Sequence, residues 1–132
     1  MRQLLAAIAM SLAAVPLATQ EAEIEGVISS QLDAFRADDF AGAFDYASPF
    51  IQGMFRTPEN FGSMVRQGYP MVHRPGDVTF QELEGAPPLM RQNVMIRDGA
   101  GAFHVLEYEM IERDGDWLIN GVRLLTAPAV GV

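Results

Sequence analysis

The chain of 132 residues contains no cysteine and no lysine. The absence of cysteine excludes disulfide bonds, thiol catalysis and thiolate metal sites, so packing alone must hold the fold together. The absence of lysine excludes Schiff-base chemistry, since all nine basic residues are arginine. The only two histidines are far apart and lack the helical spacing of zinc ligands. No phosphate-binding loop, nucleophile elbow or dinucleotide fingerprint occurs. We therefore expect no metal and no cofactor.

Positive charge is scarce as well, and the formal net charge of the chain is −8. Nucleic acids and anionic membrane surfaces attract basic patches, so this charge argues against both as partners. The acidic residues are scattered along the chain rather than gathered in a tail, and solubility is the simplest reason for them.

The one long apolar run lies at the N-terminus, where Arg2 precedes small and apolar residues from Leu4 to Val15. A basic start followed by a short apolar core is typical of a secretory signal peptide, which we place at residues 1–20. The run is shorter than the roughly 20 apolar residues that span a bilayer. We expect a single domain at residues 21–132 that is periplasmic or secreted, without stable membrane insertion after cleavage. An uncleaved membrane anchor is the alternative.

The first half of the mature chain has helical periodicity. Residues 22–37 carry an apolar stripe at spacings of three and four, in which Gln31 is the polar member. Asp38 is expected to cap a second, short helix that Ser48-Pro49 ends. A third helix is expected from Thr57-Pro58-Glu59 to Gly68, with Thr57 as its cap.

The second half alternates with a period of two. Strand-like runs at residues 77–84, 89–97, 102–112 and 116–125 are separated by turn signals, of which Asp114-Gly115 is a strong two-residue hairpin signal. The sequence therefore predicts an α+β fold, with three N-terminal helices packed on a four-stranded antiparallel sheet in a cone-shaped roll.

This order of elements resembles the nuclear transport factor 2-like (cystatin-like) α+β roll. The closing segment Gly115–Val122 resembles the last hairpin of many such domains. The segments Ala34–Phe40, Arg66–Val72 and His104–Met110 resemble a domain-of-unknown-function family of short exported bacterial proteins. The resemblance covers the mature chain and implies a fold and an export route, but it brings no known activity.

The turns also predict which strand residues share a face. The Asp114-Gly115 turn pairs Arg113 with Asp116, which would place Tyr108 opposite Gly121. If the turn at Asp98–Gly101 has two or four residues, alternate side chains of the preceding strand, residues 89–97, point to the same face. We expect this face to be the concave one. The expected concave face thus holds His104, Leu106, Tyr108, Met110, Trp117 and Ile119, together with Arg91, Asn93 and Met95.

Convergent polar groups in an apolar cavity are typical of a ligand site, so Arg91, Asn93, His104 and Tyr108 are the candidate ligand-binding residues. The weak catalytic signal favours a non-enzymatic module that binds a small apolar ligand or a protein. The alternative is a small isomerase, dehydratase or hydrolase that uses His104 with Tyr108, or Asp45 with Tyr46. An open cavity with His104 near a carboxylate would favour the enzyme, whereas a cavity filled by Trp117, Phe61 and Met64 would favour the module.

The opposite sheet face is expected to be apolar apart from Glu107 and Glu109. Such a patch is typical of an interface, and a homodimer through this face is its simplest closed form. The expected members are Val94, Ile96, Phe103, Val105, Ile111, Leu118, Val122 and Leu124.

We predict that the mature protein begins between Ala18 and Ala22, because the apolar run led by Arg2 ends there. N-terminal sequencing of the exported protein measures this directly. Exported protein that retains Met1 would contradict cleavage and support the membrane anchor.

Overall fold

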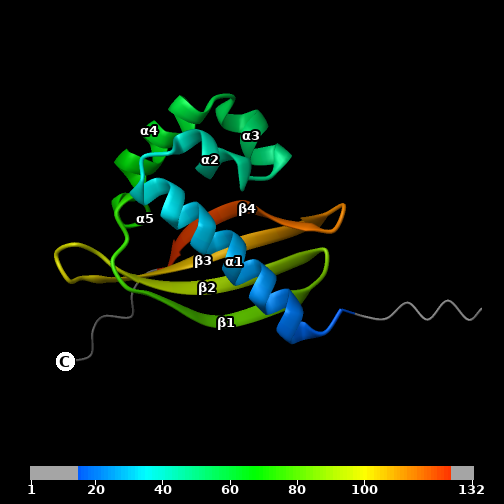
Figure 1. Cartoon of the computed structure of the whole chain (residues 1–132). Helices are drawn as coiled ribbons and strands as arrows, with labels where there is room; N and C mark the ends of the chain where they lie inside the picture. Colours follow the sequence, from blue (N-terminus) through cyan, green and yellow to red (C-terminus); the bar gives the residue numbers. More distant parts are fainter. Residues whose placement is uncertain (1–14, 126–132) are drawn as a thin grey trace, which may run out of the picture.

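A long helix lies across one face of a twisted sheet, three shorter helices gather above the edge formed by the last strand, and a fourth lies beside the C-terminal end of the long helix (Figure 1). The computed structural model describes residues 15–125, so most of the predicted leader lies outside the described residues. The helices in the described part are α1 (Leu17–Arg36), α2 (Phe40–Asp45), α3 (Pro49–Phe55), α4 (Pro58–Gly68) and α5 (Pro70–His73).

Side-chain caps set the starts of three helices. Asp39, rather than the predicted Asp38, caps α2 by accepting from the Gly42 amide at 3.0 Å. Thr57 caps α4 as predicted, at 3.1 Å from the Asn60 amide. Ser48-Pro49 was expected only to end a helix, but it also begins α3, because a serine cap followed by proline in the first turn favours a new helix. The prediction of three helices therefore missed α3 and the single turn of α5.

The sheet is antiparallel in the order β1-β2-β3-β4. Its strands are β1 (Val78–Ala86), β2 (Leu89–Arg97), β3 (Phe103–Arg113) and β4 (Asp116–Leu125). The Asp114-Gly115 hairpin has the predicted pairing of Arg113 with Asp116, and both turn residues have positive φ, as a type I′ turn requires. The α+β class and the helix-covered antiparallel sheet are confirmed.

The loop between β2 and β3 has five residues, because Arg97 pairs with Phe103. Asp98 organises it by accepting from the amides of Ala100 and Ala102, both at 2.9 Å, while Gly101 has a φ of +87°. A loop with an odd number of residues shifts the pairing of β2 with β3 by one residue relative to a loop of two or four. Each β2 side chain therefore lies on the opposite sheet face from the one predicted. The concave face of β2 therefore carries Met90, Gln92, Val94 and Ile96. The predicted concave placement of Arg91, Asn93 and Met95 is wrong.

A bulge at Asn120 changes the register between β3 and β4. Met110 pairs with Ile119 as predicted, but Glu109 pairs with Gly121, so Tyr108 lies opposite Val122 rather than Gly121. At this bulge the chain from Tyr46 to Ser48 joins the free edge of β4 through a parallel bridge between Ala47 and Ile119. The extra residue turns Val122 toward the concave side, opposite to its predicted face.

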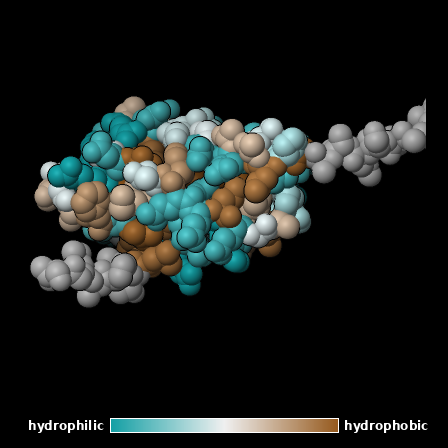
Figure 2. Space-filling view, turned by 90° about the horizontal axis from the view of Figure 1, so that it is seen from below, coloured by the Kyte–Doolittle hydropathy of each residue, from teal (hydrophilic) through white to brown (hydrophobic). Residues whose placement is uncertain are grey.

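The convex face is less apolar than predicted, because Val94 and Ile96 are fully buried on the other side. Its remaining apolar side chains, among them Phe103 and Leu118, alternate with polar ones. Glu107 pairs with Arg123 at 3.1 Å. Seen from the β1 side, apolar and polar side chains are likewise interspersed (Figure 2), which suits an exposed edge strand. The homodimer through the convex sheet face stays a prediction, and the apolar surface that it would bury is smaller than expected.

We predict that Trp117→Ala lowers the free energy of unfolding by about 3–5 kcal/mol, the usual cost of deleting a large buried aromatic side chain. Trp117 lies on the concave face as predicted and is 3% exposed. Urea unfolding measures the loss, with Leu118→Ala as the control. Leu118 is the half-buried next residue on the convex face, so its truncation should cost clearly less. Equal losses for the two variants would contradict the face assignment.

Candidate functional site

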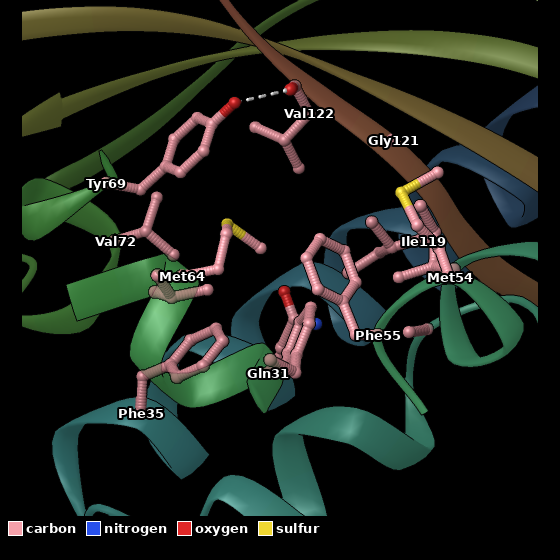
Figure 3. A pocket seen from close by; sticks show the side chains of 14 residues that line it. Gln31, Phe35, Met54, Phe55, Met64, Tyr69, Val72, Ile119, Gly121 and Val122 are labelled. Carbon is pink, nitrogen blue, oxygen red and sulfur yellow. Dashed lines mark hydrogen bonds between the residues drawn. The ribbon is translucent and has the colours of Figure 1, made fainter. Parts of the chain in front are cut away.

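A cavity of about 330 Å³ lies between the short helices, the C-terminal half of α1 and β4 (Figure 3). Its walls are almost entirely apolar. The lining residues are Gln31, Phe35, Ala47, Ile51, Met54, Phe55, Phe61, Met64, Val65, Tyr69, Val72, Ile119, Gly121 and Val122.

Helix α3 forms the outer wall of this cavity. It directs Ile51, Met54 and Phe55 toward the space, yet none of its own residues is buried. Phe50 and Met54 are 63% and 56% exposed, so α3 also presents apolar side chains to the outside. The cavity is therefore closed on this side by a short helix that the sequence analysis missed.

Two polar side chains face one another across the cavity. Gln31, 2% exposed, donates through Nε2 to the carbonyl of Ala43 at 3.1 Å, and its Oε1 points into the space (Figure 3). On the opposite wall the Tyr69 hydroxyl donates to the carbonyl of Val122 at 3.2 Å. No acidic or basic side chain belongs to the lining as the structure describes it.

The four predicted ligand-binding residues are not brought together. Arg91 and Asn93 lie on the convex face, away from His104 and Tyr108. Tyr108 is fully buried, and this burial raises the pKa of its phenol well above the usual range. Its hydroxyl has no hydrogen-bond partner within residues 15–125. Neither His104 nor Tyr108 lines the cavity.

His104 is in reach of a carboxylate, but that carboxylate belongs to the loop rather than to the cavity. Its Nε2 lies 2.8 Å from Asp98 Oδ2, while Asp98 Oδ1 takes two backbone amides. The hydrogen bond from His104, followed by those from Ala102 and Ala100, holds the pKa of Asp98 below its usual range. The pair thus fixes the β2–β3 loop. Asp45, of the second predicted pair, is exposed at the end of α2.

A second charged cluster joins the end of α1 to α5. Arg74 donates to both carboxylate oxygens of Asp38, at 2.9 and 2.8 Å, and through Nη1 to the carbonyl of Phe35. His73 Nε2 lies 2.8 Å from Asp38 Oδ1, and the His73 ring stacks on Phe40. These contacts hold α5 against α1. They thereby also position Val72, the α5 residue that lines the cavity. His73 lies at the end of α5, the single helical turn that was not predicted from the sequence.

Sequence reasoning missed most of the residues that line the cavity, although it placed Ile119 on the concave face. One signal for Gln31 was present, because it is a polar residue within the apolar stripe of α1. For α3 the signal was Ser48-Pro49, which begins a new helix as well as ending the previous one. For Tyr69 no comparable signal exists, since its role depends on how the helices fold back over β4.

Among residues 15–125, no three metal-binding side chains are clustered closely enough to hold an ion. Over the same residues, none of the helices combines the length and apolarity needed to cross a membrane.

Comparison with known proteins supports the fold. A family model described as a domain of unknown function (DUF4864) matches residues 17–132, whereas no curated protein matches. A solved structure named Rd1NTF2_05, with five substitutions, is 17% identical with a TM-score of 0.56, covering 80% of this chain and 98% of that one. An NTF-2 like protein of unknown function from Burkholderia xenovorans LB400 is 18% identical with a TM-score of 0.48, covering 84% and 91%. The likeness to Rd1NTF2_05 confirms the nuclear transport factor 2-like fold.

We predict that Asp38→Asn lowers the urea midpoint at pH 5 and that this deficit shrinks at pH 2. Hydrogen bonds from Arg74 and His73 lower the pKa of Asp38 from 3.8 to about 2. Because the Asp38 carboxyl has a lower pKa in the folded protein than in the unfolded chain, its ionised form stabilises the fold. This stabilisation is complete above about pH 4 and is lost as the pH falls through about 2. The control is Asp33→Asn, which breaks an exposed pair with Arg36. A deficit that does not change with pH would contradict the clamp.

Proposed function

The chain belongs to the DUF4864 family, a domain of unknown function, and from this premise we propose that it is a non-enzymatic module that binds a small apolar ligand. The site is the cavity between α1, the short helices and β4. The observation that carries the proposal is an open space of about 330 Å³ with almost wholly apolar walls. Ligand pockets are typically concave, mostly apolar and about 300–1,000 Å³ in volume, with a few polar groups that orient the ligand.

The geometry supports binding better than the alternative of an isomerase, dehydratase or hydrolase. General acid–base catalysis needs a titratable group within hydrogen-bond reach of the substrate. His104 is engaged with Asp98 outside the cavity. Tyr108 is buried beneath it, with a raised pKa that disfavours loss of its proton. Fold alone does not decide between these classes, because rolls of this kind serve both.

The place of action is part of the same proposal. The leader pattern at residues 1–20 supports binding in the periplasm or outside the cell. In that aqueous compartment a small apolar molecule gains free energy by entering an apolar cavity, because transfer of apolar surface out of water drives its binding.

We expect Met64→Trp to weaken the binding of 2-methylnaphthalene, an uncharged apolar probe, at least about tenfold. The larger side chain would occupy the space into which Met64 projects (Figure 3). Equilibrium dialysis measures the affinity. Met95→Trp is the matched control, since Met95 is also half-buried but lies on the convex face. If the wild-type protein does not bind the probe, or if both variants bind it equally, the cavity is not the site.

A further inference from the structure

Resting on the proposed function, we propose that the ligand of this cavity is a neutral molecule with one hydrogen-bond donor, such as an alcohol or phenol, and that Gln31 Oε1 is the acceptor that selects it. The inference depends on how the Gln31 amide is held, on the charge of the cavity walls and on the size of the space.

The orientation of the Gln31 amide is fixed by its own hydrogen bond. Nε2 donates to the Ala43 carbonyl at 3.1 Å, and the reverse orientation would place two acceptors against each other. Oε1 is thereby directed into the cavity (Figure 3). No hydrogen bond from a group in residues 15–125 reaches this oxygen, although Gln31 is only 2% exposed. The oxygen is open to the cavity rather than fully enclosed, so its hydrogen-bond donor comes from water or from a ligand in the cavity.

A ligand that fills the cavity must replace any water at this oxygen. If it carries a donor, the hydrogen bond is regained; if it does not, a buried acceptor is left unpaired, which is costly. Because the Tyr69 hydroxyl is directed to the Val122 carbonyl and the other lining side chains of the described residues are apolar, the Gln31 oxygen decides between ligands of equal shape. We expect a preference of about tenfold for the ligand that has the donor, the usual scale of one such hydrogen bond.

The walls also reject charge. None of the eight arginines in residues 15–125 belongs to the cavity lining, and neither histidine does. The Tyr69 hydroxyl already donates to the Val122 carbonyl. A bound carboxylate would therefore be desolvated without a cationic partner, which is strongly unfavourable. The ligand is therefore a neutral alcohol rather than an acid anion of the same skeleton.

The volume sets the size of the apolar part. A cavity of about 150 Å³ in another protein holds benzene, and the present one is about 330 Å³. A ligand with two fused aromatic rings therefore matches the volume of this cavity. The test probes are accordingly 2-naphthol, 2-methylnaphthalene and 2-naphthoate, which share one skeleton and differ in donor and charge.

Equilibrium dialysis of the three probes at pH 7 tests the inference. The wild-type protein should bind 2-naphthol about tenfold more tightly than 2-methylnaphthalene, and 2-naphthoate most weakly. In Gln31→Met, which keeps the length of the side chain but loses the acceptor, 2-naphthol should bind no more tightly than 2-methylnaphthalene, because its hydroxyl would be left without a partner. Tyr69→Phe is the control: it removes the hydroxyl on the opposite wall and should leave the preference unchanged. Thermal unfolding verifies that each variant is folded.

The outcomes separate the two proposals. Failure of all three probes to bind would overturn the proposed function itself. Binding of 2-methylnaphthalene without a preference for 2-naphthol would overturn only the role of Gln31. A preference that persists in Gln31→Met, or that is lost in Tyr69→Phe, would likewise overturn that role. Should Gln31→Met not fold, the wild-type ratio and Tyr69→Phe still decide the matter, because they need no change at Gln31.

Discussion

The attachment of Ser48 to the free edge of β4 is the contact on which the cavity depends. The Ser48 amide donates to the Ile119 carbonyl at 2.8 Å, and the Ile119 amide donates to the Tyr46 carbonyl at 2.9 Å. The Ser48 hydroxyl donates to Asn120 Oδ1 at 2.7 Å and accepts from the Ile51 amide to cap α3. One buried side chain thus fixes the bulge in β4 and the start of the outer helix. Both features border the cavity, because the bulge turns Val122 toward it and α3 forms its outer wall.

The sequence predicts the bounds of the strands well, but it does not predict which sheet face each side chain occupies. The reason is the length of one loop. The bounds of β2 and β4 follow from alternation and turn residues, and the Asp-Gly hairpin has a single favoured geometry. The Asp98–Gly101 segment is different, because it contains glycine at positions 99 and 101 and either one tolerates a positive φ. Only the structure shows that Gly101 takes it and that Asp98 gathers two amides. Because the loop has one residue more than the four expected, Arg91 and Asn93 lie on the convex face rather than the concave one.

Most of the polar groups that attract attention in the sequence serve the fold instead of the cavity. His104 and Asp98 secure a loop, and Asp38, His73 and Arg74 tie α5 to α1. Gln92 is fully buried, and its Nε2 reaches the carbonyls of Gln81 and Asn93 at 3.0 and 2.9 Å, next to the irregularity in β1. In a chain without disulfides, such contacts supply the cross-links that packing alone would lack. The candidate site could not be predicted from these residues, because side-chain chemistry alone does not distinguish a structural partner from a functional one.

This division of roles also explains why the cavity can stay open. A buried acid or histidine in its wall would need a charged partner or bound water, and either would occupy part of the space. With the titratable groups engaged elsewhere, the wall keeps only the Gln31 oxygen and the Tyr69 hydroxyl as polar features. Of the two, Tyr69 already has its partner in Val122. Under the proposed binding role, the walls would supply affinity through burial of the ligand, and the Gln31 acceptor would supply selectivity through the cost of leaving it unpaired.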